Sequence, residues 1–164
     1  MSSDPNREKL LSLIECVFPT TPVPAEDRLL AIDGDEARED TRLFIGRKWS
    51  ELDADFVHQN GWALSWFTAE AFCYYLPAFL KAMITTPNFS NYYFVSTYSY
   101  LEPAESHTLT AFRKKRIEAL TELQRDFLIA WLEWMIDKSS TEPIYQKDLV
   151  NARNVLIEGS WKNW

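Results

Sequence analysis

A dense group of carboxylates between positions 26 and 40 is the first part of the sequence whose residue types could do chemistry. The stretch holds seven acids against two arginines. Paired carboxylates can act as general acid and base, or they can bind a basic protein surface; a solvated helix face is the plain alternative. Glu36 and Asp40 are four positions apart and would share one face of a helix. The candidate partner-binding residues here are Asp33, Asp35, Glu36, Glu39 and Asp40.

Histidine and cysteine are too sparse to form the other common kinds of site. The two histidines and two cysteines include no Cys-x-x-Cys pair and no Cys/His cluster, so we expect no metal. A Cys–His nucleophile would need Cys73 beside His58 or His107, but Cys73 lies in an apolar stretch where a thiol usually packs as a small hydrophobic group. No Gly-x-Ser-x-Gly turn and no glycine-rich phosphate loop occurs, so we also expect no cofactor.

Two further sets of residues could contact a partner. The segment 121–138 carries an acidic stripe at helical spacing, and Ile129 falls in the middle of that stripe at 100° per residue. A lone exposed isoleucine is ordinary, but one flanked by carboxylates is a candidate contact residue. Trp161 and Trp164 either fold back on the domain or act as interface anchors. The acids of the stripe are Glu122, Asp126, Glu133 and Asp137.

The overall charge favours a basic protein as the partner. The net charge is −7, which repels nucleic acid and anionic membranes, although solubility alone also explains it. Residues 113–116, Arg-Lys-Lys-Arg, are the one basic run. Four consecutive residues point around most of a helix, so we expect no nucleic-acid site there. We expect no membrane partner either, because the uncharged apolar runs are shorter than the ~20 residues of a membrane span.

The spacing of apolar residues is helical, and only four glycines are available for the tight turns of an all-β domain. Capping signals place helix starts at Asp4, Ser50, Thr68 and Thr121. We predict an all-α bundle of about six or seven helices in a single domain, residues 1–164. The main predicted helices cover about 4–17, 35–44, 68–83, 108–138 and 143–157, with short helices after Pro24 and Ser50. The capping pattern at Thr121 leaves open whether 108–138 is one helix or two helices joined near Leu120.

The segment 67–83 is the most informative of these elements. Its apolar stripe, which we expect to pack against the helix 121–138, includes Phe72, Leu76, Phe79 and Leu80. Pro77 falls in the third turn and removes an amide donor, so we expect a kink or two half-helices that meet at Leu76. Residues 88–101 mix aromatic and β-branched side chains, and we favour a short helix or irregular segment over a lone strand.

The same segment carries a resemblance. Residues 67–80 read Phe-Thr-Ala-Glu-Ala-Phe-Cys-Tyr-Tyr-Leu-Pro-Ala-Phe-Leu. This resembles a family of small bacterial proteins of unknown function that share a Phe-x-x-Glu-Ala-Phe-x-Tyr-Tyr-Leu-Pro-Ala-aromatic-Leu motif. Trp49 upstream and residues 121–134 downstream are also similar, so the resemblance covers about residues 10–158. It implies a predominantly helical domain and brings no activity, cofactor or catalytic residue.

Together these observations favour a non-enzymatic, acidic, cytoplasmic domain that binds a basic protein, in the manner of an immunity protein or antitoxin. The polar N-terminus lacks the apolar core of a signal peptide. Nothing in the sequence supports a disulfide between Cys16 and Cys73, although one is possible, and free thiols fit a reducing compartment. Two alternatives stay open. One is a carboxylate-based enzyme that uses Glu36, Asp40 and Glu70. The other is a homodimer that pairs through Ile129 and tryptophan surfaces.

Overall fold

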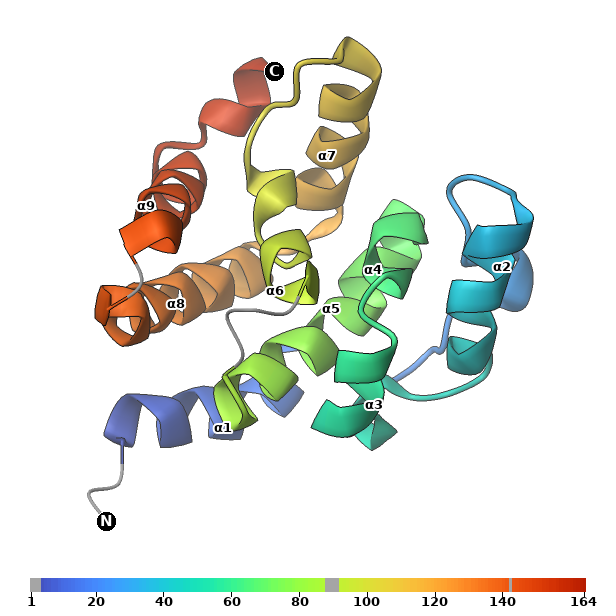
Figure 1. Ribbon diagram of the computed structural model, residues 1–164, viewed down its shortest axis with the longest axis horizontal. Helices are drawn as coiled ribbons and strands as arrows, with labels where there is room; N and C mark the ends of the chain where they lie inside the picture. The colour runs from blue at the N-terminus through green and yellow to red at the C-terminus, as the bar shows by residue number, and fades with distance from the viewer. Residues whose placement is uncertain (1–3, 88–91, 142) are drawn as a thin grey trace.

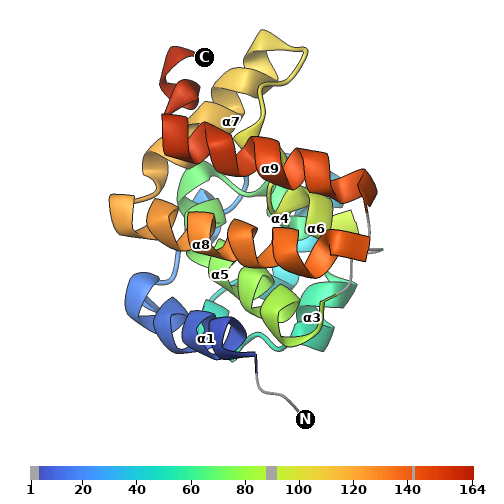
Figure 2. The ribbon, with the colours of Figure 1, turned by 90° about the vertical axis from the view of Figure 1, so that its left-hand side faces the viewer.

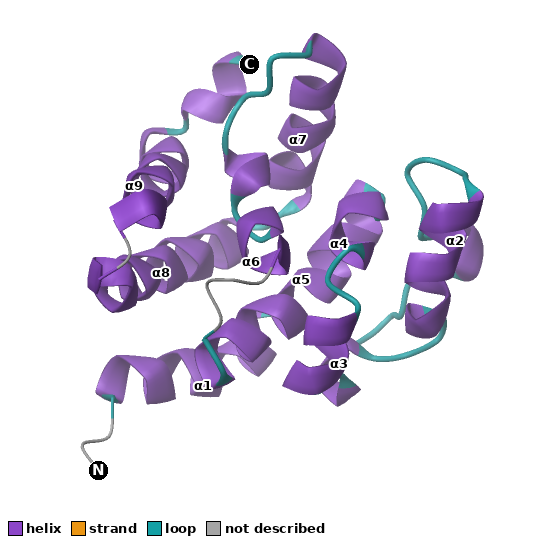
Figure 3. Cartoon of the chain, in the orientation of Figure 1, coloured by secondary structure: helices purple, strands orange, loops and turns teal. Residues whose placement is uncertain are grey.

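The structure, a computed structural model, describes residues 4–87, 92–141 and 143–164. In these residues the chain forms nine α-helices and no strand, with 3-10 turns between several of them (Figures 1 and 3). The predicted all-α class is confirmed. The helices are α1 (Pro5–Val17), α2 (Asp35–Thr41), α3 (Ala54–Gln59), α4 (Ala63–Trp66), α5 (Ala69–Thr85), α6 (Tyr92–Ser96), α7 (His107–Ala119), α8 (Glu122–Lys138) and α9 (Pro143–Glu158).

Side-chain caps begin most of the long helices where the sequence predicts them. Asp4 accepts hydrogen bonds from two backbone amides at the start of α1, and Thr68 accepts one from Ala71 at the start of α5. Thr121 and Gln124 form a complete capping box at the start of α8, which separates it from α7. These caps satisfy amides that have no partner inside their own helix.

The expected cap at Ser50 is wrong. Ser50 lies within a 3-10 turn (Trp49–Glu51), and the helix that follows begins three residues later as α3. Its cap is Asp53, whose Oδ1 accepts from the amide of Phe56 at 2.8 Å. Both residues are good capping types, so the sequence alone did not separate them. Helix α4 was not predicted. Helix α6 lies within the segment 88–101, where a short helix was one of the two favoured outcomes; residues 88–91 of that segment lie outside the described residues.

Helix α5 continues from Ala69 to Thr85 with Pro77 inside it. Of the two expected outcomes, the division into two half-helices is therefore wrong, and the kink stays a prediction. A proline in a helix interior removes one hydrogen bond and costs about 3 kcal/mol when exposed. Here Pro77 and most of its helix are buried. Burial of large side chains such as Phe72, Leu76 and Phe79 offsets that cost at roughly 25 cal/mol per Å² of apolar surface.

Helices α1, α8 and α9 form a layer beside α5 (Figure 2). Helix α8 packs mainly against α1 and α9, whereas α5 packs mainly against α1, α3 and α7. Buried side chains of α5 and α8 nevertheless belong to one core cluster, which includes the predicted stripe of α5. The consequence for function is that one side of α8 lies beside α1 at the surface.

Candidate functional site

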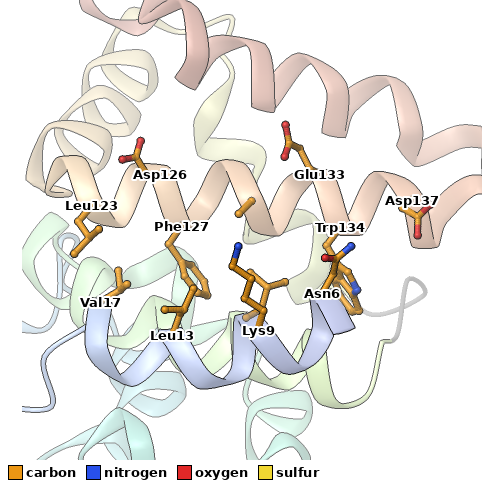
Figure 4. Close-up of a pocket in the computed structure, with 12 residues that line it drawn as sticks. Asn6, Lys9, Leu13, Val17, Leu123, Asp126, Phe127, Glu133, Trp134 and Asp137 are labelled. Carbon is orange, nitrogen blue, oxygen red and sulfur yellow. The ribbon is translucent and has the colours of Figure 1, made fainter. Parts of the chain in front are cut away.

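A groove lies along the contact of α1 with α8, and we call it the α1–α8 groove (Figure 4). Its volume is about 560 Å³, which falls within the ~300–1,000 Å³ of ordinary ligand sites. Helix α1 contributes Asn6, Lys9, Leu10, Leu13 and Val17, and helix α8 contributes Leu123, Asp126, Phe127, Ala130, Glu133, Trp134 and Asp137.

The spacing of these residues explains the groove. On α1 the lining positions include 6, 10, 13 and 17, and on α8 they include 123, 127, 130 and 134. Both sets alternate steps of four and three residues, which keeps side chains on one face of a helix. The helices run antiparallel, with Leu123 opposite Val17 and Trp134 opposite Asn6 (Figure 4). Ala130 lies mid-way along α8, and its single methyl group leaves the space open.

The floor of the groove is apolar, and part of it is accessible. Leu10, Phe127 and Trp134 are buried, but Leu13 is 40% exposed and Leu123 is 59% exposed. A single exposed leucine is unremarkable on a soluble protein. Two exposed leucines on facing helices of the same concave surface form a place where a partner can bury apolar area.

Negative charge borders this apolar floor on the α8 side. Three carboxylates line the groove, from Asp126, Glu133 and Asp137, against the one ammonium of Lys9. Figure 4 shows Asp126 and Glu133 on the side of α8 opposite α1, while Lys9 points from α1 toward α8. The groove therefore offers an apolar strip with an acidic border.

The end of the groove near Trp134 is fixed by Asp4. Oδ2 of Asp4 accepts a 3.0 Å hydrogen bond from Nε1 of Trp134 and lies 2.7 Å from Nζ of Lys138. Its Oδ1 caps α1 through the amides of Asn6 and Arg7. The bond from Lys138, followed by those from Trp134 and the backbone, holds the pKa of Asp4 well below its ordinary value.

The five candidate acids of residues 33–40 lie on and before α2, away from this groove. Asp33 accepts two bonds from the guanidinium of Arg38, at 2.7 and 2.6 Å, and this pairing lowers the pKa of Asp33. Oδ2 of Asp40 accepts a 2.7 Å bond from Nε1 of Trp66. Asp35, Glu36 and Glu39 are exposed, and Asp35 lies 3.9 Å from Arg38. As a partner-binding set, these acids stay a prediction.

The three apolar candidates also lie outside the groove. Ile129 is half-buried and packs against the core. Its neighbour Ala130 lines the groove, between Asp126 and Glu133 in the sequence. Trp161 is only 8% exposed, and Trp164 is half-buried against the same core. Both tryptophans therefore fold back on the domain, which was one of the two expected outcomes.

No group of three or more His, Cys, Asp or Glu side chains in the described residues could hold a metal ion. Both cysteines are free thiols; Cys16 is exposed, and burial raises the pKa of Cys73 to about 12. Of the acids considered for an enzyme, Asp40 is bonded to Trp66, and Glu70 is exposed and 3.6 Å from Arg28. These contacts give the carboxylates structural partners.

Three of the four residues in the basic run on α7 donate hydrogen bonds to backbone carbonyls of other segments, which the sequence did not reveal. Nη1 of Arg113 donates to the carbonyl of Glu102 at 2.9 Å, and Nζ of Lys114 donates to the carbonyls of Lys162 and Trp164. Arg116 is buried and donates to three backbone carbonyls. Only Lys115 of the four is exposed, so the run does not form a continuous cationic surface.

Sequence reasoning identified the acidic stripe of α8 but missed the groove beside it. Three of the four acids in that stripe line the groove; Glu122 does not. The missing half is the matching face of α1, with the same four-three spacing. That spacing is visible in the sequence, but which two helices lie side by side is decided by tertiary packing.

Comparison with known proteins gives a family and no activity. Among the helices of the described ranges, none is both long enough and apolar enough to cross a membrane. No curated protein and no solved structure matches the chain significantly. That the family shares the motif of residues 67–80, and that its members are bacterial, stay predictions. Residues 7–156 match the model of a family of unknown function, DUF6714, so the chain belongs to that family.

Proposed function

We propose that this chain is a non-enzymatic protein-binding domain whose α1–α8 groove takes a basic amphipathic helix from a partner protein. The observation that carries the proposal is the presence of two exposed leucines, Leu13 and Leu123, in one groove with three carboxylates. The apolar face of such a helix would cover the leucines. Its lysines and arginines would lie near Asp126, Glu133 and Asp137.

The shape of the groove supports a helical occupant. Both of its walls are helices that present residues at alternating steps of four and three, which is the pattern that a third helix packs against. The lining runs from Asn6 to Val17 on α1, which corresponds to roughly 16 Å at ~1.5 Å per residue, or three turns. A partner helix of about eleven residues or more would fill it.

The charge of the groove supports a basic partner over an acidic one. Three carboxylates outnumber one ammonium in the lining, and the whole chain carries −7. A basic toxin held by an immunity or antitoxin protein is one partner of this chemistry, and it is the specific form of the proposal that the sequence favours. The proposed location is the cytoplasm, where the thiols of Cys16 and Cys73 would stay reduced. Nucleic acid and membranes are not proposed as partners.

The test is photo-cross-linking from inside the groove in the source organism. A photoreactive amino acid replaces Ala130, and in a matched variant it replaces Leu43, which is 45% exposed and lies outside the groove. The cross-linked segment is then sequenced by mass spectrometry. We expect a cross-link from position 130 and none from position 43. The captured segment should be rich in Lys and Arg and carry apolar residues at steps of three and four. Adding Glu133→Lys should abolish the cross-link.

Several results would overturn the proposal. These are an acidic or non-helical segment, a second copy of this chain, equal capture from positions 130 and 43, or no cross-link at all. A second copy would favour the homodimer that the sequence left open. Because Ala130 is exposed at the surface, the replacement leaves the core in place.

A further inference from the structure

A second, smaller cavity lies between α4, the α6 region and α7, and we call it the arginine cavity. Its volume is about 150 Å³. It is lined by Ser65, Val95, Ser96, Ser99, Tyr100, Leu109, Phe112, Arg113 and Arg116. Two arginines and no carboxylate appear in this lining. Val95 and Leu109 are 37% and 43% exposed, so the cavity is open to solvent on that side.

Arg116 brings a buried positive charge to the cavity wall. It is only 5% exposed, and its guanidinium lies 4.2 Å from the ring centre of Phe72 and 4.4 Å from that of Phe112. Burial lowers the pKa of Arg116 to about 10, so the side chain stays charged at neutral pH. Within the described part of the chain, no carboxylate forms an ion pair with it.

The hydrogen bonds of Arg116 offset only part of the free-energy cost of burying its charge. Nη2 donates to the carbonyls of Leu64, Ser65 and Phe67 at 2.9–3.1 Å, which caps the end of α4. Carbonyl dipoles and aromatic faces stabilise a cation, but they carry no full opposite charge. Nε of Arg116 and the hydroxyl of Tyr100 are both buried without a hydrogen-bond partner in the described structure. Unpaired buried polar groups of this kind are uncommon in proteins and call for an explanation.

Arg113 adds a second cation to the same wall. Its Nη1 donates to the backbone carbonyl of Glu102, and the carboxylate of Glu102, whose charge acts on Arg113, does not line the cavity. Structural capping explains Nη2 of Arg116, but it does not explain why two arginines, serine hydroxyls and an unpaired tyrosine line one open cavity. An anion in the cavity would supply the missing opposite charge.

We propose that the arginine cavity binds a small organic carboxylate with a short apolar body. The arginines and the hydroxyls of Ser65 and Ser99 would hold the carboxylate, and the apolar body would lie against Val95, Leu109 and Phe112. A cavity of 150 Å³ is large enough for a molecule the size of benzene, about six heavy atoms. This site is separate from the α1–α8 groove and does not depend on the function proposed for it.

The test is a titration of the full chain, monitored by calorimetry and ligand-observed NMR. The four compounds are acetate, butyrate, butyramide and inorganic phosphate. We expect butyrate to bind at least tenfold more tightly than neutral butyramide and more tightly than phosphate. Arg113→Gln should weaken butyrate binding at least tenfold, and Leu109→Trp should abolish it by filling the cavity. Lys115→Gln removes the same charge from an exposed position of the same helix and should leave binding unchanged.

Each contrary result has a definite meaning. Equal binding of butyrate and butyramide would show that the charge is not recognised, and tighter binding of phosphate would make the site one for inorganic anions. If Lys115→Gln weakened binding as much as Arg113→Gln does, the effect would come from the net charge of the chain and not from the cavity. No binding by any of the four compounds would overturn the proposal. The variants avoid Arg116 itself, because its bonds to the carbonyls at the end of α4 also contribute to the fold.

Discussion

The indole of Trp134 donates a 3.0 Å hydrogen bond to the carboxylate of Asp4, a residue 130 positions earlier in the chain. The ammonium of Lys138 lies 2.7 Å from the same oxygen, and the other oxygen of Asp4 caps α1. One ionised side chain therefore begins α1 and holds it against α8. We therefore expect the spacing of the two helices, and so the shape of the α1–α8 groove at this end, to depend on that charge.

Replacement of Asp4 should change how stability depends on pH. Its contacts hold the folded-state pKa of Asp4 below the ordinary value of 3.8, so the unfolded chain binds this proton at a higher pH than the folded chain does. The stabilisation is present above the ordinary pKa and is lost as the pH falls through the folded-state pKa. We expect Asp4→Asn to lower Tm at pH 7 and to flatten the fall of Tm below about pH 4.

Thermal denaturation at pH 7, 4 and 2 checks this prediction, with Asp55→Asn as the matched control. Asp55 is an exposed acid in the first turn of α3 and has no ion pair among those of the described residues. If Asp4→Asn lowered Tm by the same amount at pH 7 and pH 2, the ionised carboxylate would not be the group that holds the two helices.

A buried tyrosine on α5 gives a prediction about the core. The hydroxyl of Tyr75 donates to the carbonyl of Phe44 at 2.7 Å and lies 3.0 Å from that of Arg47. Tyr75→Phe keeps the ring but removes the donor to the carbonyl of Arg47. The carbonyl of Phe44 keeps only its 3.1 Å bond from the amide of Arg47, and we expect the change to cost about 1–2 kcal/mol. For a chain of this size, we expect Tm to fall by about 2–8 °C.

Tyr74→Phe is the comparison for that variant. Its hydroxyl also donates to a carbonyl, that of Thr20 at 2.7 Å, but Tyr74 is only half-buried, so water can replace the lost donor. We expect a smaller change in Tm than for Tyr75→Phe. In urea denaturation, a lower midpoint with an unchanged m-value would confirm that each substitution acts on stability. An equal loss in the two variants would contradict the role assigned to burial.

The parts of this fold that the sequence predicted are those decided by neighbouring residues. Caps at Asp4, Thr68 and Thr121 act within three positions of themselves, so their residue types were sufficient. The continuity of α5 through Pro77 was not predictable in this way, because it depends on burial of the whole helix. The sequence contains the proline but not the packing that compensates for it.

The same difference explains the candidate site. The acidic stripe of α8 follows from helical spacing, and three of its acids line the groove. Ile129 was singled out from an angle of 100° per residue, which places its neighbour Ala130 just as near the stripe. Only the positions of α1 and α9, which lie beside different sides of α8, decide which residue faces the groove.

The buried arginine of α7 should not tolerate a lysine. Nη2 of Arg116 contacts three carbonyls while its planar group lies near two aromatic rings. A lysine ammonium lacks this flat, forked geometry, so Arg116→Lys would leave a buried charge with fewer partners. We expect a loss of at least about 2 kcal/mol in the free energy of unfolding. Chemical denaturation measures it, with Lys115→Arg as a neutral control; a loss under 0.5 kcal/mol, as for an ordinary surface change, would contradict this role.

The two thiols should differ strongly in reactivity. Cys16 is exposed on α1, whereas burial raises the pKa of Cys73 to about 12. At pH 8 the thiolate fraction of Cys73 is therefore on the order of 10⁻⁴, and the thiolate is the reactive form. We expect iodoacetamide to label Cys16 in the folded protein and to leave Cys73 unmodified until unfolding. Peptide mapping checks this, and rapid labelling of Cys73 in a folded Cys16→Ser variant would show that this part of α5 is open.

Binding at the groove should depend on the charges of α8 and on salt. As a probe we would use a synthetic helical peptide with leucines at steps of three and four and lysines beside them, followed by fluorescence anisotropy. We expect the double variant Asp126→Lys/Glu133→Lys to weaken binding about tenfold, or about 1.4 kcal/mol, and rising salt to weaken binding to the unmodified chain. Leu123→Glu should also weaken it, because this leucine supplies apolar area.

The controls for that measurement separate the groove from the other acidic surface. Ile144→Glu places a new charge at an isoleucine of α9 that is 75% exposed and outside the groove, and it should have little effect. Glu36→Lys reverses an exposed acid of α2, the surface that the sequence first indicated. Long-range attraction should fall only slightly in that variant, because the Debye length at physiological salt is about 8 Å. If Glu36→Lys weakened binding as much as the double variant of α8, the peptide would be binding at α2 or through net charge, and the groove would lose its assigned role.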